Sequence, residues 1–330
     1  MKTKFKFLTS VLIVAVMSSC EKAPSINEEG NLVPKTVEYD ASLPAISVNG
    51  TLLHAEAFGN PQDPMLVVLH GGPGSDYRSL LNCKKFAENG YYVVFYDQRG
   101  SGLSKRESKD SYSLQVMLDD LTGVINHYRS SPTQKVFLLG HSWGAILATA
   151  YINAYPNAIT GAILAEPGGF KWQDIMDYVG RARSYSFTSE TLNDFMYMDQ
   201  FLTGNEDQHA ILDYKLGLAQ ASDGAPDSPI GNEATPIFWR SGAIVNRALF
   251  DLGESENPDW TTNLHEYSTE ILFTFSERNT AYGLSHAQHV SSAYPNVQLE
   301  MIRNAGHDML AFPNGFNNFF PLALNYLNNH

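Results

Sequence analysis

Short apolar runs alternate with amphipathic stretches along most of the chain. Strand patterns occur at 65–69, 91–96, 136–139, 159–165, 271–275 and 297–302. Helical patterns occur between or after them, at 77–88, 114–128, 145–150 and 314–328. Strands that read as continuous apolar runs are typical of a parallel sheet, because helices cover both of its faces. The pattern therefore predicts an α/β fold with a mostly parallel central sheet and helices on both faces.

Two segments depart from this alternation. Residues 46–58 alternate apolar and polar positions and turn at Asn49-Gly50, which predicts a β-hairpin at the start of the fold. Residues 170–262 are aromatic and Met-rich, with helical stretches, and lie between the fourth and fifth apolar runs. We interpret this second segment as a helical cap over the strand ends. The α/β core is then expected at 46–169 and 263–330.

Residues 1–19 have the pattern of a targeting signal. Three early lysines precede an apolar core at 7–16 that is too short to span a bilayer. Small residues immediately before Cys20 resemble a bacterial lipobox. The resemblance implies a lipoprotein signal peptide, cleavage before Cys20 and lipidation of its thiol. An ordinary signal peptide with an incidental cysteine is the alternative interpretation.

The polar, proline-bearing segment 20–45 is expected to be a tether between this anchor and the folded domain. The protein is accordingly expected in the bacterial cell envelope, in contact with membrane only through its lipid. Cys83 is the one other cysteine, so no internal disulfide is expected after lipidation of Cys20.

Charge and composition narrow the possible partners. The formal net charge is −13 and no basic patch appears, which excludes nucleic acid and anionic lipid headgroups as favoured partners. The acidity suits cationic substrates, and it equally serves solubility. The sequence has no metal-ligand cluster and no cofactor fingerprint, so neither a metal nor a cofactor is expected.

The most informative segment is Gly-His-Ser-Trp-Gly at 140–144. It follows the apolar run 136–139 and precedes a helical pattern, the strand–turn–helix context of a nucleophile elbow. Such a turn requires small residues two positions before and after the serine, and Gly140 and Gly144 meet that requirement. The turn presents the Ser142 hydroxyl at a helix N-terminus, where a backbone N–H and the helix dipole favour an oxyanion.

Four motifs together resemble the α/β-hydrolase relatives of prolyl aminopeptidase, also known as proline iminopeptidase. They are HGGPG at 70–74, DQRGSG at 97–102, GHSWG at 140–144 and GH at 306–307. The resemblance covers about residues 46–328 and is weakest in the cap. It implies an α/β-hydrolase fold and a serine hydrolase that removes an N-terminal residue, often proline, from small peptides.

The resemblance implies a role for each matching residue. Ser142 is the expected nucleophile, and His307, in the loop after the last strand, is the expected general base. The oxyanion donors are expected to be the backbone N–H of Trp143 and one from the Gly71-Gly72 turn. His70 is expected to shape that turn, and the Trp143 side chain is expected to pack.

The third member of the triad departs from the family pattern. The usual aspartate position, in the loop after the first strand beyond the cap, holds Asn279. Asparagine lacks the charge that stabilises an imidazolium, and such a change in a triad costs about 10⁴ in rate. Glu166 ends the strand after the elbow helix, and some haloalkane dehalogenases of the same fold resemble this placement. We predict Glu166 as the acid, with Glu277 as the alternative.

The substrate is less closely defined. The family anchors a substrate amine with cap glutamates, but Val245 occupies one such position here. Glu190, Glu206 and Glu233 remain as candidate anchors. The predicted function is release of an N-terminal residue from small peptides through an acyl-enzyme. An esterase or amidase with the same site is one alternative. A weakly active hydrolase-fold binding protein, motivated by Asn279, is another.

Overall fold

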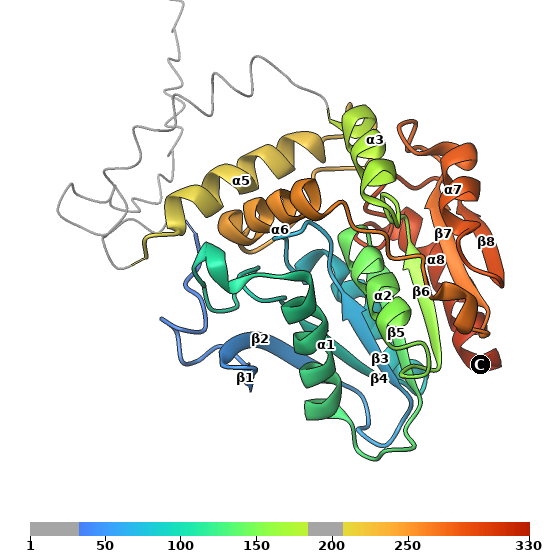
Figure 1. Cartoon of the computed structure of the whole chain (residues 1–330), viewed down its shortest axis with the longest axis horizontal. Coiled ribbons are helices and arrows are strands. Elements are labelled where there is room, and N and C mark those ends of the chain that lie inside the picture. The colour runs from blue at the N-terminus through green and yellow to red at the C-terminus, as the bar shows by residue number, and fades with distance from the viewer. Residues whose placement is uncertain (1–32, 184–206) are drawn as a thin grey trace, which may run out of the picture.

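The computed structural model describes residues 33–183 and 207–330. At its centre lies an eight-stranded sheet with the order β1-β2-β4-β3-β5-β6-β7-β8 (Figure 1). β2 is antiparallel to β1 and β4, and the other neighbouring strands are parallel. The strands are β1 (Ala45–Val48), β2 (Thr51–Phe58), β3 (Met65–Leu69), β4 (Tyr92–Tyr96), β5 (Val136–His141), β6 (Gly161–Ala165), β7 (Ile271–Ser276) and β8 (Val297–Ile302). The predicted α/β fold is confirmed.

The two faces of the sheet bury two separate apolar clusters, because successive strand residues point to opposite sides. In β3, Met65, Val67 and Leu69 belong to one cluster, whereas Leu66 and Val68 belong to the other. The first cluster includes residues of α1 (Leu114–Tyr128), α2 (Trp143–Ala154) and α7 (Gly283–Ser291). The second includes residues of the 3₁₀ segment η1 (Arg78–Asn89) and of α8 (Pro313–Asn329). Helical segments thus cover both faces.

The hairpin expected at the start of the fold forms between β1 and β2. Its two turn residues, Asn49 and Gly50, have φ values of 45° and 77°. Positive φ at both central positions is the requirement of a type I′ turn, whose twist matches that of the flanking strands. Asparagine followed by glycine is the favoured pair for this geometry.

Part of the expected tether is packed on the domain, which corrects that prediction for residues 33–44. Thr36 and Val37 are buried, and the Val37 N–H donates to the Leu103 carbonyl at 2.8 Å. The Pro34 carbonyl accepts from the Arg240 guanidinium at 3.0 Å. Composition did not reveal this because the contacts use backbone groups, which every residue carries.

The predicted signal and Cys20 lie outside the described residues and stay predictions. Within 33–183 and 207–330, no helix combines the length and the apolar character needed to cross a bilayer.

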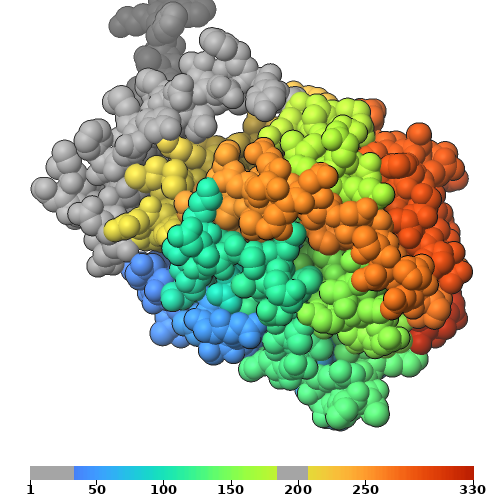
Figure 2. Space-filling model, viewed as in Figure 1, coloured from blue at the N-terminus to red at the C-terminus, as the bar shows by residue number. Residues whose placement is uncertain are grey.

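Three described helices of the segment 170–262 lie over the carboxyl ends of the parallel strands (Figure 1). They are α3 (Trp172–Ala182), α5 (Ala210–Asp223) and α6 (Ala243–Glu256). On the molecular surface α6 lies between α5 and α3 (Figure 2). The two ends of the segment meet: the Trp172 N–H donates to Pro258 at 3.0 Å, and the Trp260 N–H donates to Phe170 at 2.9 Å.

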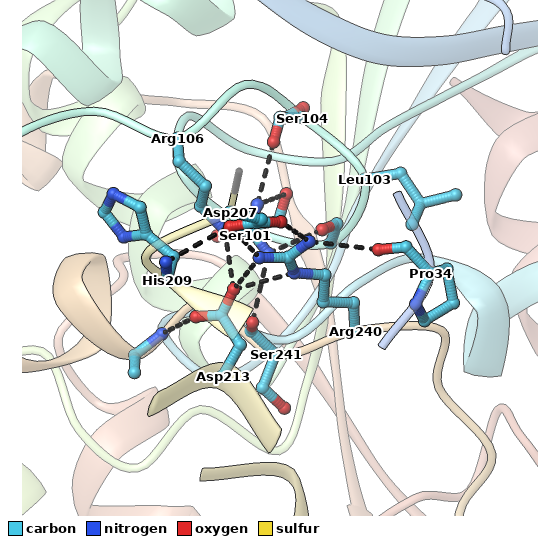
Figure 3. Close-up of polar contacts among 12 residues, drawn as sticks. Pro34, Ser101, Leu103, Ser104, Arg106, Asp207, His209, Asp213, Arg240 and Ser241 are labelled. Carbon is cyan, nitrogen blue, oxygen red and sulfur yellow. Dashed lines mark hydrogen bonds and ion pairs between the residues drawn. The ribbon is translucent and has the colours of Figure 1, made fainter. Parts of the chain in front are cut away.

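A buried ionic cluster joins α5 and the start of α6 to the core (Figure 3). Asp213 of α5 accepts from the Nε atoms of Arg106, at 2.9 Å, and Arg240, at 2.7 Å. Arg240 also donates to Asp207 at 2.6 Å. Arg106 belongs to the loop after β4, so one carboxylate ties two elements of the cap segment to a loop of the core.

The same cluster fixes the start of α6 beside the loop at 70–74. The second oxygen of Asp213 accepts from the Ala243 N–H at 2.9 Å, at the helix N-terminus. One turn later, Asn246 donates to the Pro73 carbonyl at 2.7 Å. The Gly242 N–H donates to the Gly74 carbonyl at 2.6 Å. The position of α6 is therefore coupled to the glycine loop that borders Ser142.

Candidate active site

Ser142 lies between β5 and α2 in a backbone conformation that side-chain-bearing residues rarely adopt, with φ 54° and ψ −121°. The turn is tight on both sides. A Cβ atom at position 140 would lie 2.5 Å from the Ala145 nitrogen, and one at position 144 would lie 2.6 Å from the Leu69 carbonyl carbon. Only glycine fits at either place. Strain of this kind persists where the surroundings over-determine it, as at active sites.

The glycine loop approaches Ser142 closely. A Cβ atom at Gly71 would lie 3.2 Å from the Ser142 Cβ, which is tighter than ordinary contact. His70 fixes this loop: its Nδ1 lies 2.8 Å from the Gly71 carbonyl, and its Nε2 accepts from the Gln98 N–H at 2.9 Å. His70 is fully buried and does not line the cavity beside Ser142.

Trp143 has two N–H groups, one on its indole ring and one on its backbone. Its indole Nε1 donates to the Gln98 side chain at 3.0 Å, and the ring is buried. Its backbone N–H is the first of α2 and so has no partner four residues earlier within the helix. Gly71 and Gly72 line the same cavity as Ser142. The role of these groups as oxyanion donors stays a prediction.

His307 and Glu166 are hydrogen-bonded. The His307 Nδ1 lies 2.9 Å from the Glu166 Oε2, within the distance expected for the predicted acid. Glu166 is fully buried, and its Oε1 accepts from the Ser276 N–H at 2.9 Å and from its hydroxyl at 2.7 Å. A buried carboxylate needs such partners to offset lost hydration. Glu166 also has a positive φ of 49°, directly after β6.

The surroundings of His307 favour its charged form. Burial lowers the pKa of His307, but the hydrogen bond and the charge of Glu166, together with Asp308, outweigh burial, and the pKa is raised above 6.5. His141 contacts the same residue through its Nε2, 2.8 Å from the His307 carbonyl. Burial and the neighbouring His307 lower the pKa of His141. The two histidines therefore differ in their tendency to take up a proton.

The alternative acid, Glu277, points elsewhere. Its Oε2 accepts from the Asn304 N–H at 2.8 Å, at an exposed position. Asn279 is buried and donates through its Nδ2 to the Tyr178 hydroxyl at 3.0 Å. That hydroxyl lies 3.3 Å from the His307 Nδ1.

Sequence reasoning missed two of the groups around His307 and Glu166. Ser276 ends a strand beside Glu166, a position that could have drawn attention to it. Tyr178 had no signal, because it lies in the cap segment, more than a hundred residues from His307 along the chain.

Ser142 and His307 open into one cavity of about 720 Å³. Its walls are largely apolar and come from the glycine loop, α3, α5, α6 and the segment between the last two. The apolar side chains include Val179, Leu216, Leu218, Ile230, Ile237, Phe238 and Phe250. Two carboxylates, Asp223 and Asp308, also line it. Burial raises the pKa of Asp223, opposed by the charge of Arg183.

None of the glutamates expected to bind an amine lines this cavity among the described residues. Glu233 accepts from Asn314 at 2.8 Å and from the Gly315 N–H at 3.3 Å, so it joins the cap segment to α8. Glu190 and Glu206 lie outside the described residues. Val245 is fully buried in the core. Asp223 and Asp308 were not among the predicted anchors.

The DQRG motif holds loops together instead of lining the cavity. Asp97 pairs with His54 at 2.8 Å and accepts from the Tyr77 N–H at 3.0 Å. Arg99 donates through Nε to Asp120 at 2.7 Å. Over the described ranges, no group of three or more His, Cys, Asp or Glu side chains is placed to hold a metal ion.

Comparison with known proteins places the chain in a family. The profile for serine aminopeptidases of family S33 matches residues 60–215. The chain is 36% identical to the proline iminopeptidase of Heyndrickxia coagulans over 257 residues, which cover 73% of this chain and 83% of that protein. The chain belongs to the S33 serine aminopeptidase family. It is thus an enzyme of the α/β-hydrolase superfamily, a serine hydrolase, as its four motifs predicted.

The chain is also similar, over part of its length, to an epoxide hydrolase. Over 121 residues this serine hydrolase is 34% identical to epoxide hydrolase B of Mycobacterium tuberculosis, covering 36% of this chain and 33% of the relative. This chain likewise spans only 33% to 35% of the length of several relatives that it matches. The proline iminopeptidase structure of Mycobacterium smegmatis aligns with a TM-score of 0.58 at 16% identity, covering 87% of this chain and all of that one. At that identity the likeness shows the fold alone.

Proposed function

We propose that this serine hydrolase is an aminopeptidase that releases the N-terminal residue, often proline, from small peptides. One observation carries the proposal: a serine on a strained elbow and a histidine paired with a buried glutamate open into the same cavity. In this arrangement Ser142 serves as nucleophile, His307 as general base, and Glu166 as the acid that orients the base. The proline iminopeptidase relative supports the choice of peptide substrates.

The reaction begins with attack of the Ser142 Oγ on the scissile carbonyl carbon. His307 takes the hydroxyl proton through Nε2, while Glu166 holds Nδ1–H and stabilises the imidazolium. The oxyanion is bound by the Trp143 backbone N–H and by an N–H of the Gly71-Gly72 turn. His307 then gives its proton to the leaving amine, and an acyl-enzyme remains on Ser142. Water, deprotonated by His307, releases the N-terminal amino acid.

The cavity suits a small, partly apolar amino acid with a positive charge. Apolar walls accept a proline or aliphatic side chain. Asp223 and Asp308 are the candidate partners for an ammonium group, and Arg183 lines the same cavity. An esterase or amidase acting through the same three residues is the second candidate. It is motivated by the absence of the expected cap glutamates from the cavity lining that the described residues form.

The test compares proline and alanine naphthylamides with short nitrophenyl esters, on the wild type and on Ser142→Ala. Aminopeptidase action predicts a higher kcat/KM for the naphthylamides and loss of turnover in Ser142→Ala. A fluorophosphonate probe should label Ser142 in the wild type. Faster ester cleavage that also depends on Ser142 would favour the esterase. Labelling of another residue, or none in folded protein, would refute the nucleophile.

A further inference from the structure

The family resemblance implied an aspartate at position 279, and the amide of Asn279 faces a tyrosine of the cap. Its Nδ2 lies 3.0 Å from the Tyr178 hydroxyl. Its Oδ1 lies 3.2 Å from the Tyr282 backbone N–H. Because a backbone N–H only donates, the amide oxygen must face Tyr282, and the NH₂ group must face Tyr178. Asn279 is therefore a donor to the Tyr178 oxygen.

The Tyr178 oxygen faces a second donor. His307 Nδ1 lies 2.9 Å from Glu166 and 3.3 Å from the Tyr178 hydroxyl. An ionised carboxylate only accepts, so Nδ1 carries a proton and donates it mainly to Glu166. Its longer contact with Tyr178 makes that oxygen a second, weaker acceptor. The Nδ1 side of His307 is thus held from the core by Glu166 and from the cap by Tyr178.

The tyrosine ring is itself held in place. Tyr178 belongs to α3 and is buried. Its ring packs edge-on against Tyr282, with centroids 5.2 Å apart, and stacks on His286 at 5.8 Å. The aromatic contacts and the Asn279 hydrogen bond leave the hydroxyl little freedom to leave His307.

We propose that Tyr178, held by Asn279, is a positioning residue that orients the general base His307 and makes that orientation depend on the seating of cap helix α3. The inference rests on the proposed roles of Ser142, His307 and Glu166. Asn279 then has a definite use at the former acid position: its amide group orients the tyrosine, and Glu166 provides the charge.

The first test compares Tyr178→Phe with Tyr282→Phe. Both variants lose one buried tyrosine hydroxyl in the same aromatic contact, but the Tyr282 hydroxyl donates to the Pro167 carbonyl at 2.7 Å and does not bond His307. Tyr178→Phe should lower kcat about fivefold, the effect of one modest hydrogen bond, with KM nearly unchanged.

The pH profile gives a second readout. The acidic limb of kcat/KM for Tyr178→Phe should move to lower pH, because the His307 imidazolium loses an acceptor. The other groups facing His307, namely Glu166, His141 and Asp308, are the same in both variants. Tyr282→Phe should keep kcat and the pH profile.

The second test uses the asparagine position. Glu166→Gln alone should be nearly inactive. Adding Asn279→Asp places a carboxylate beside the Tyr178 O–H, whose oxygen still accepts from His307 Nδ1. Activity should rise at least about tenfold over Glu166→Gln, a fraction of the value of a triad charge. The rise should vanish when Tyr178→Phe is added to this pair.

Two results would overturn the inference. Tyr178→Phe could match Tyr282→Phe in kcat and in pH profile, or the rise from Asn279→Asp could survive in the triple variant. Fluorophosphonate labelling of Ser142 in the wild type separates these results from failure of the proposed function. Full activity of Glu166→Gln would refute the proposed acid and, with it, this inference.

Discussion

Two buried carboxylates, Glu166 and Asp213, each lie at the centre of a network of polar side chains. Neither side chain is more than 1% exposed. Glu166 bonds a histidine and a serine, whereas Asp213 bonds two arginines and a helix N-terminus. The two carboxylates are alike in burial and differ in the kind of partner they hold.

The partners decide what each network can do. An arginine stays charged at any pH a protein meets, so the cluster around Asp213 moves no proton and fixes geometry. Histidine changes its charge near neutral pH, so the pair around Glu166 can transfer one. His307 lines the cavity, and neither Arg106 nor Arg240 does. Burial and charge alone would not have separated the chemical network from the structural one.

Removal of the Glu166 charge should give the largest effect. Glu166→Gln is expected to lower kcat about 10⁴-fold, because the imidazolium loses its counter-charge, while the fold is kept. Steady-state kinetics on a naphthylamide, with circular dichroism as a check on folding, measures both. Glu277→Gln is the matched control and should stay close to wild type, since the Glu277 carboxylate accepts from the Asn304 backbone N–H at an exposed site. An inactive Glu277→Gln beside an active Glu166→Gln would reverse the assignment.

Removal of the Asp213 charge should lower the free energy of unfolding, and it removes no group that takes part in the reaction. Asp213→Ala leaves two buried arginines without a shared counter-charge and should cost about 3–5 kcal/mol in the free energy of unfolding. Urea denaturation measures this loss. Asp251→Ala is the control, because Asp251 pairs with Lys109 and Arg247 on the surface, where little stability is expected. Equal midpoints for the two variants would show that the cluster does not hold the cap.

The pH dependence of the wild type should show the smallest effect and refine the contrast. The general base must be neutral to accept the serine proton, so activity falls as pH drops through the pKa of His307. Because the hydrogen bond and charge of Glu166 raise the pKa of His307, the acidic limb of kcat/KM should lie above the pH at which an ordinary histidine titrates. A limb below that value would mean that burial outweighs Glu166. The free energy of unfolding should not change over this pH range because of the arginine cluster, since its guanidinium groups stay protonated.

The sequence predicted those parts of the site that follow from the ends of strands. Apolar runs located the parallel strands, and their carboxyl ends carry Ser142, Glu166 and the loop of His307. Asn279 cannot supply the charge of a triad acid, which directed attention to Glu166 at another strand end. The cost of an unpaired buried carboxylate then predicted a partner such as His307 for it. Periodicity indicated that helices occur in the cap, but it could not indicate which cap side chain reaches the site.

Contacts between distant segments were not predictable in this way. Arg106 and Asp213 are 107 residues apart, and nothing in either local sequence specifies the other. Tyr178 reads as one more aromatic residue of an amphipathic helix. Residues 33–44 look like a linker by composition, yet their backbone groups pair with the domain. Such contacts depend on where the cap helices pack against the core, and local sequence patterns do not specify that placement.

The meeting of the two ends of the cap segment, where Trp172 bonds Pro258 and Trp260 bonds Phe170, has an evolutionary consequence. The chain leaves the sheet and returns to it at one place, so insertions, deletions or exchanges within the excursion need not shift any strand. Substrate preference can then diverge quickly while the catalytic framework is inherited unchanged. Tyr178 would limit that freedom, because a lineage that replaces its α3 would also lose one support of its own histidine.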